Sequence, residues 1–146
     1  MNDQLWQFDL TKCKIPRMKK MSNTFTLSNI TANKELIVTL FSAVDSSDWN
    51  LLKHCFDKNI IYERPGYEPF VGLDKLLYFY QYERIIASGK HQIEHIAVDN
   101  NHGACWGKFI GLHKNGSPIN EGFADVYSFE NGKLKTRRSY FFRPAV

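Results

Sequence analysis

The chain has 146 residues, a formal net charge of +4, 43% apolar residues and 14% aromatic residues. This length suits one domain with its own hydrophobic core and indicates no second domain. The apolar runs are short, so we expect neither a membrane span nor a signal peptide.

The charge and the cysteines narrow the function classes further. Five basic residues lie in the first 20 positions, and the rest of the chain is close to neutral. A nucleic-acid-binding domain usually carries a basic stripe across its folded body, so we expect no nucleic-acid partner. The three cysteines, Cys13, Cys55 and Cys105, have unrelated spacings. They indicate free thiols in a reducing cytosol, without disulfide bonds or a zinc knuckle.

The N-terminal third predicts an extension followed by two helices. Residues 1–31 show no sustained period, and we predict a partly disordered extension there, followed by one domain over residues 32–146. From Asn33 an apolar stripe with a period near 3.6 predicts a helix. Its members are Leu36, Ile37, Leu40, Phe41 and Val44. The sequence "DSSDW" interrupts this pattern, and we predict a short second helix with Ser47 as its cap.

The middle of the chain predicts one strand and a third helix. "NIIYERP" has strand character and is stopped by Pro65. The stretch "GLDKLLYFYQYERIIASG" predicts a helix that opens near Asp74 and stops at Gly89.

The last 55 residues or so change to strand periodicity. Four strand-like runs are separated by "DNNHG", "KNGSP" and "ENGK", which all have turn chemistry. They predict an antiparallel meander. The fold class is therefore α+β, a cone-shaped α+β barrel in which a curved antiparallel sheet packs against three helices. Such a cone has one mouth and encloses a natural pocket for a small molecule.

The order of these elements, with "CFDKNIIYERPGYEPFVGLDKLLYFY" and "FADVYSFENGKLKTRRSYFF", resembles the nuclear-transport-factor-2-like superfamily. Within it, the chain is similar to the branch of ketosteroid isomerases and SnoaL-like polyketide cyclases, over roughly residues 33–143. The resemblance implies the cone-shaped fold and a homodimer. Its members include isomerases, cyclases, epoxide hydrolases, dehydratases and binding modules without catalysis, so the function has to come from the site.

The resemblance carries over to only some of the catalytic positions. Arg64 stands where the isomerases have a proton-shuttling carboxylate, and Leu40 where they have a tyrosine. Phe109 stands where the cyclases have a histidine, and Ser139 is the nearest match to a catalytic aspartate of the epoxide hydrolases. Asp125 in "FADVYSF" matches the acid of the third sheet strand, which serves as general base in the cyclases.

Asp125 and Arg64 are two of the three candidate catalytic residues. Strand alternation places Asp125 on the same side as Glu121, Phe123, Tyr127 and Phe129. If that side faces the cone, desolvation makes Asp125 a general base or acid; alternatively it is a structural partner of a nearby arginine.

Arg64 places a permanent positive charge at the pocket wall. It would bind a carboxylate, phosphate or enolate, or else form a structural ion pair with Glu63, Glu68 or Asp125. These two interpretations stay open.

His95 is the third catalytic candidate. The register implied by the family points it into the cone, where it would act as acid or base or as a hydrogen-bonded wall residue. "HQIEH", from His91 to His95, also fits a zinc motif that works on a helix. Here the run has strand character, so we predict no metal and no cofactor.

Further residues are expected to line the pocket or to lie opposite it. The predicted substrate-binding residues are Tyr62, Tyr80, Phe109, Phe123, Tyr127 and Arg137. Alternation places Trp106, Ile110 and Leu112 on the outer sheet face, through which the resemblance implies a homodimer.

The function expected from the sequence is a cytosolic, cofactor-free enzyme of specialised metabolism. It would transfer protons on a small carbonyl or polyketide-like substrate, as an isomerase, cyclase or dehydratase. The alternative is a non-catalytic member of the fold that binds a small molecule or stabilises a partner protein. We expect that a cone filled by Phe109, Phe123 and Tyr127 would favour this alternative.

Overall fold

The computed structural model describes residues 23–143, and the predicted disorder of residues 1–22 lies outside this range. The described chain forms three helices, one π-helical turn and a six-stranded sheet. The elements in chain order are α1 (Asn23–Ser46), α2 (Trp49–Cys55), β1 (Phe56–Glu63), β2 (Phe70–Val71), α3 (Leu73–Tyr78), η2 (Phe79–Glu83), β3 (Ile86–Asp99), β4 (His102–His113), β5 (Pro118–Glu130) and β6 (Lys133–Phe141).

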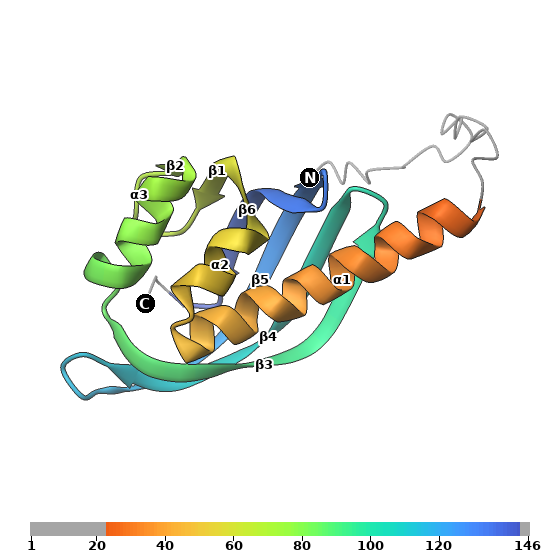
Figure 1. Ribbon diagram of the computed structural model, residues 1–146. Coiled ribbons are helices and arrows are strands. Elements are labelled where there is room, and N and C mark those ends of the chain that lie inside the picture. Colours follow the sequence, from red (N-terminus) through yellow and green to blue (C-terminus); the bar gives the residue numbers. More distant parts are fainter. Residues whose placement is uncertain (1–22, 144–146) are drawn as a thin grey trace, which may run out of the picture.

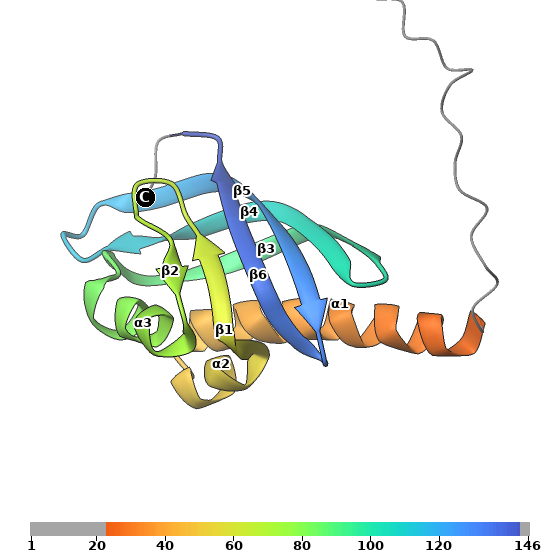
Figure 2. The same cartoon turned by 90° about the horizontal axis from the view of Figure 1, so that it is seen from above.

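The sheet is strongly curved, and the helices lie on its inner side (Figures 1 and 2). Its strand order is β2-β1-β6-β5-β4-β3. Strands β3 to β6 form the predicted antiparallel meander, which is confirmed. Strand β1 pairs in parallel with β6, and β2 pairs antiparallel with β1, so the sheet is mixed and stays open. The α+β fold with a curved sheet over three helices is confirmed.

Helix α1 crosses the inner side of the sheet and supplies much of the core. The predicted apolar stripe is confirmed, because Ile37, Leu40, Phe41 and Val44 are all buried. Full burial of such a side chain contributes about 1.5–3 kcal/mol relative to leaving it exposed. The predicted start at Asn33 was wrong, since α1 begins at Asn23, and helical backbone therefore extends into the segment predicted as an extension.

Two residues between α1 and α2 turn the chain. Ser47 adopts a left-handed backbone with φ 55°, which ends α1. Asp48 caps α2, because its carboxylate accepts the Leu51 backbone N–H at 2.9 Å. The prediction that Ser47 caps α2 was wrong by one residue, because Ser47 forms the turn that precedes the cap.

The segment after β1 explains why an arginine stands directly before a proline. Arg64 accepts a backbone hydrogen bond from Tyr67 at 3.2 Å, and Gly66 between them has φ 84°. Proline second and a left-handed glycine third are the pattern of a type II turn. This turn connects β1 to β2, a short strand that the sequence pattern missed.

The predicted third helix is much shorter than expected. The helical segment consists of α3 and the π-helical turn η2 and ends at Glu83. The Arg84 backbone N–H donates to the Phe79 carbonyl at 2.9 Å, which closes the π-helical turn. The predicted stop at Gly89 was wrong, because Gly89 lies inside β3. A Cβ atom on Gly89 would lie 2.2 Å from the Phe109 ring, so glycine here serves packing and not helix termination.

A β-bulge divides β3 into two halves whose side chains alternate in opposite phase. The register with β4 shifts between Ile93 and His95. Before the shift, His91 and Ile93 face the helices, and after it Ile96 and Val98 do. Gly107 lies opposite the shift, where a Cβ atom would come within 2.0 Å of the Gln92 carbonyl oxygen. The bulge therefore requires a residue without a side chain at position 107.

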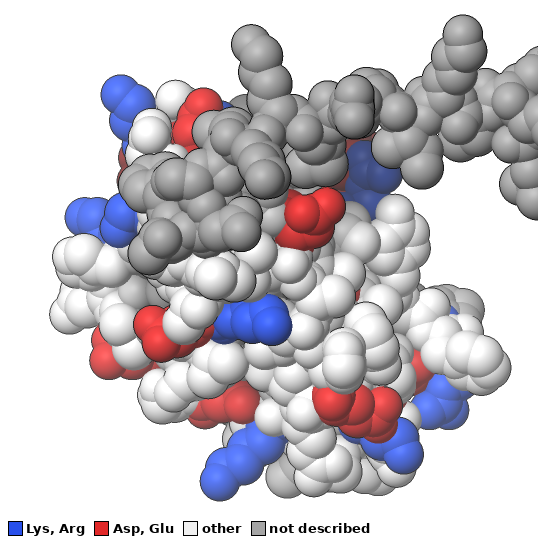
Figure 3. All heavy atoms as spheres, turned by 90° about the vertical axis from the view of Figure 1, so that its right-hand side faces the viewer, with Lys and Arg blue, Asp and Glu red and all other residues white. Residues whose placement is uncertain are grey.

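The described surface is mixed in charge. On the face seen in Figure 3, Lys and Arg side chains are interspersed with Asp and Glu wherever the atoms are described. Among residues 23–143, no helix is long and apolar enough to cross a membrane.

Candidate functional site

A small polar cavity lies between the inner face of the sheet and the loop after η2. Its volume is about 30 Å³, and its walls carry three arginines, one histidine, two acidic residues and three phenylalanines. The arginines are Arg64, Arg84 and Arg137, which come from three different elements or loops. Three guanidinium groups around so small a space indicate a site for negative charge.

Asp125 and Arg137 form a buried ion pair in this wall. Arg137 Nη2 lies 2.6 Å from Asp125 Oδ2, and Nε donates to the same oxygen at 2.8 Å. The Tyr127 hydroxyl also donates to Oδ2, at 3.0 Å. The predicted inward orientation of Asp125 is confirmed. These contacts favour its structural interpretation, as a partner of an arginine, while a catalytic role stays a prediction.

Arg137 is held from several sides. Its Nη1 donates to the Tyr80 hydroxyl at 2.9 Å, and its guanidinium carbon lies 4.7 Å from the centre of the Tyr62 ring. Burial alone lowers the pKa of Arg137, but Asp125 and the surrounding tyrosines outweigh it and raise that pKa well above its usual value. Arg137 is therefore a fixed cation that organises the interior.

A second chain of contacts connects Arg64 to the cavity. Arg64 Nη1 donates to the Tyr62 hydroxyl at 3.3 Å, and this hydroxyl lies 3.0 Å from Ser139 Oγ. Because the guanidinium can only donate, the Tyr62 oxygen accepts from Arg64, and either hydroxyl can donate in the Tyr62–Ser139 contact. Burial raises the pKa of Tyr62, but Arg137 and Arg64 outweigh it, so the net pKa is lowered.

The alternative interpretation of Arg64, as an ion-pair partner of Glu63 or Asp125, is not supported. Glu63 binds Arg138 at 2.5 Å on the outer face, and Asp125 binds Arg137. The Arg64 guanidinium instead lies 4.9 Å from the centre of the Phe141 ring. Arg64 lines the cavity, as expected for an anion-binding residue.

His91 is the histidine that faces the interior, and Asp45 at the end of α1 holds it. One Asp45 oxygen accepts the His91 backbone N–H at 2.8 Å, and the other lies 2.5 Å from Nδ1. Asp45 thereby fixes Nδ1 as the protonated nitrogen and leaves Nε2 as the acceptor. Burial lowers the pKa of His91 despite the opposing effect of Asp45, so the ring is neutral at pH 7.

The predicted inward orientation of His95 was wrong. Its side chain is exposed on the outer face, where its ring stacks on Trp106 at 4.8 Å. The β-bulge after Ile93 reverses the side to which His95 points. For the same reason His91 and His95 lie on opposite faces of β3, so "HQIEH" cannot place both on one metal. The described residues contain no group of three or more metal-ligating side chains.

The predicted substrate-binding residues divide into two groups. Phe109, Phe123 and Arg137 line the cavity. The tyrosines Tyr62, Tyr80 and Tyr127 are buried and do not line this cavity, and their contact with a ligand stays a prediction. A buried hydroxyl needs a hydrogen-bond partner, and the arginines and Asp125 supply these partners inside the core.

The sequence reasoning missed Asp45, His91 as a site residue, and the cavity-facing role of Arg84. Signals for two of them were present. Asp45 is the first residue of the predicted break "DSSDW", and two adjacent polar residues, Glu94 and His95, interrupt the alternation of β3. The inward turn of Arg84 depends on η2, for which the sequence has no comparable signal.

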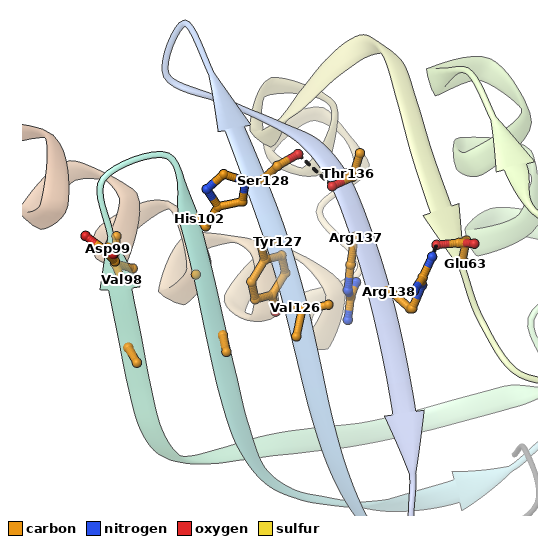
Figure 4. Close-up of a pocket in the computed structure, with 13 residues that line it drawn as sticks. Glu63, Val98, Asp99, His102, Val126, Tyr127, Ser128, Thr136, Arg137 and Arg138 are labelled. Carbon is orange, nitrogen blue, oxygen red and sulfur yellow. Dashed lines mark hydrogen bonds and ion pairs between the residues drawn. The ribbon is translucent and has the colours of Figure 1, made fainter. Parts of the chain in front are cut away.

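A larger hollow, of about 740 Å³, lies on the outer face of the sheet (Figure 4). Asp99 and His102 lie at its β3–β4 end, and the Glu63–Arg138 pair lies at the other side. Small side chains such as Ala97 and Ala104 form its floor. Of the residues that line the inner cavity only Arg137 also borders this hollow, whereas Asp125, His91 and Arg84 do not, so the inner cavity is the better candidate for chemistry.

Comparison with known proteins agrees with this architecture. The profile of the SnoaL-like domain matches residues 37–136. The chain belongs to the SnoaL-like family. The comparison of this SnoaL-like chain with curated protein sequences gives no match.

Several solved structures share the fold of this SnoaL-like protein. A SnoaL-like polyketide cyclase, so named, from Jannaschia sp. CCS1 has a TM-score of 0.71 at 10% identity, covering 86% of this chain and 92% of that one. An epoxide hydrolase of the LEH-like type from M. tuberculosis has a TM-score of 0.69 at 13% identity, with 77% and 84% covered. Bal32a, from a soil-derived mobile gene cassette, has a TM-score of 0.69 at 19% identity, with 78% and 92% covered. At these identities the likeness shows the fold alone.

Proposed function

We propose that this SnoaL-like protein is a small-molecule enzyme that transfers a proton next to a carbonyl group, without a cofactor. The observation that carries the proposal is the Asp45–His91 pair at the wall of a cavity lined by arginines. His91 is the general base, and Nε2 accepts the proton. Asp45 orients the ring and stabilises the imidazolium that forms.

The enolate that remains after proton removal needs hydrogen-bond donors. Ser139 lines the cavity, and its hydroxyl proton is left for a ligand when Tyr62 donates to its oxygen. Arg64 supports Tyr62 from behind and contributes positive charge. Donors that are already oriented stabilise a developing oxyanion without reorganisation during the reaction. Asp125 has no direct step in this scheme and keeps Arg137 in place.

Hydrogen–deuterium exchange tests the proposal without knowledge of the natural substrate. A panel of small ketones and oxo acids is incubated with the protein in D₂O, and loss of the α-proton signals is followed by NMR. We expect exchange above background for at least one compound, its loss in His91→Gln, and its retention in His95→Gln. Absence of exchange with the wild-type protein across the panel would overturn the proposal.

A second candidate function is non-catalytic binding of a small molecule. The observation that favours it is the small cavity volume of about 30 Å³, with Phe109, Phe123 and Phe141 in its lining. A cavity of this size holds only very small groups unless a side chain moves. Saturable ligand binding in the absence of any α-proton exchange would favour this function.

We further propose that two copies of the chain associate through the outer face of the sheet. Trp106, Ile110, Leu112 and Val126 project from this face and are each 41–45% exposed. Val126 borders the hollow floored by Ala97 and Ala104, and Trp106 lies two positions from Ala104 on β4, so exposed and recessed apolar surfaces are adjacent. A contiguous apolar surface of this kind is typical of a protein interface.

A further inference from the structure

Arg84 projects from the end of the π-helical turn into the rim of the cavity. Its guanidinium carbon lies 5.7 Å from the centre of the Tyr80 ring and 5.8 Å from that of the Phe109 ring. Within residues 23–143, no hydrogen bond or ion pair of its side chain is found, although the side chain is mostly buried. Arg84 therefore has aromatic contacts on its faces and free donors along its edge.

The acidic residues around the cavity are already bound to other groups. Asp125 pairs with Arg137, and Asp45 holds His91. Glu121 accepts from Arg143 Nε at 3.1 Å and from the Arg143 backbone N–H at 3.2 Å. No carboxylate of the described residues thus neutralises Arg84. Burial, which removes water from the guanidinium, lowers the pKa of Arg84.

Arg84 and His91 flank the same aromatic ring. The His91 ring centre lies 4.7 Å from that of Phe109, and the Arg84 guanidinium lies over the same Phe109 ring. Both residues also line the same cavity, so one small ligand can contact both, with an anionic end at Arg84 and a neighbouring carbon at His91. A planar carboxylate matches the paired donors of a guanidinium group, and the flanking rings favour a flat group over a tetrahedral one.

We propose that Arg84 binds the carboxylate of a small organic acid, so that the substrate class of this site is oxo acids. The proposal rests on the proton-transfer function where it calls the bound acid a substrate. Binding of the acid at Arg84 does not itself require catalysis. The Arg84 donors hold the carboxylate, and His91 Nε2 faces a carbon of the bound acid.

Anion binding at Arg84 also changes the charge around His91. The charged groups that face His91 are Asp45 from α1, Arg84 from the loop and Arg137 from β6, with Glu121 and Asp125 of β5 further along the wall. Arg84 and Arg137 both lower the pKa of His91. A carboxylate on Arg84 offsets that effect, so binding raises the pKa of His91 and becomes tighter as the pH falls.

The test uses acetate as the probe and acetamide as its uncharged counterpart. The His91 Cε1–H signal is followed by NMR during titration of the full chain. We expect acetate to saturate the signal with a Kd on the order of millimolar, acetamide to have little effect, and the pKa of His91 to rise on binding. Arg84→Gln should weaken acetate binding at least tenfold, Arg84→Lys should weaken it less, and Arg138→Gln on the outer face should bind as the wild type does.

Three outcomes would overturn the proposal. These are equal binding by Arg84→Gln and wild type, equal binding of acetamide and acetate, or no acetate binding by the wild type. Deuterium exchange separates the two proposals: acetate binding without exchange contradicts only the enzymatic function, and exchange that survives Arg84→Gln contradicts only the role of Arg84. Thermal unfolding of each variant confirms that the fold is retained.

Discussion

Asp45 holds His91 at two points, with one carboxylate oxygen on the backbone N–H at 2.8 Å and the other on ring Nδ1 at 2.5 Å. The contact joins the last turn of α1 to the middle of β3. A single carboxylate thus fixes the position, the tautomer and the orientation of the ring. The Phe41 ring, one turn earlier in α1, packs against the same imidazole at 4.5 Å.

Asp45→Asn should change the tautomer of His91. The asparagine amide can donate to Nδ1, which moves the ring proton to Nε2 and removes the acceptor from the cavity. Because Asp45 raises the pKa of His91, its loss should lower that pKa further. Imidazole ¹⁵N shifts measure both effects. Asp48→Asn is the matched control, since Asp48 caps α2 without contacting His91, and equal shifts in the two variants would contradict the prediction.

The stability of the protein should fall as the pH drops below neutrality, in part through His91. The pKa of His91 is lower in the folded protein than its ordinary value of 6.5. As the pH falls, His91 is therefore protonated in the unfolded chain before it is protonated in the folded protein. The stability that the neutral His91 contributes above pH 6.5 is lost as the pH falls through the pKa of His91 in the folded protein. Urea unfolding at pH 7.5 and 5.5 should show a smaller loss for His91→Gln than for wild type. The exposed His95→Gln should behave as wild type, and an unchanged loss in His91→Gln would refute the assignment.

Breaking the Asp125–Arg137 pair should be costly. Either Asp125→Asn or Arg137→Met leaves a buried polar group without its partner, and we expect a loss of about 3–5 kcal/mol in the free energy of unfolding. The double variant should lose less than the sum of the two. The half-exposed Glu63–Arg138 pair is the control, with an expected effect of about 0–1 kcal/mol. Similar losses for both pairs would mean that burial does not control the energetics here.

Gly107→Ala should destabilise the sheet at the β-bulge. The new Cβ would lie 2.0 Å from the Gln92 carbonyl oxygen, and a backbone atom cannot move aside cheaply. We expect a loss of about 1–3 kcal/mol, measured by chemical denaturation. Gly122→Ala lies in the same sheet with no other atom within 4 Å of its Cβ, and it should change stability by less than about 1 kcal/mol. A tolerated Gly107→Ala would show that the bulge can relax.

Replacement of Trp106 by aspartate should prevent the proposed self-association. The side chain is 43% exposed and stacks on His95, so the substitution leaves the core intact. Light scattering should report a dimer for the wild type and a monomer for Trp106→Asp. The exposed Val38→Asp on α1 is the control. A monomeric wild type at high concentration would exclude the proposed interface.

The sequence by itself determined the order of elements and much of the inner wall. Turn chemistry separated the four strands of the meander, and strand alternation correctly oriented Phe123, Asp125 and Arg137 inward and Trp106 outward. These features depend on local periodicity, which a single sequence contains.

Only the tertiary structure decided which ionisable groups meet. The bulge at Ile93–His95 made His91, and not His95, the inward-facing histidine. One inserted residue reverses the side to which every later residue of the strand points. The turn η2 directed Arg84 inward, and the parallel pairing of β1 with β6 brought Tyr62 to Ser139, 77 positions away along the chain. Such contacts follow from the fit of distant backbone segments, and no local pattern contains that information.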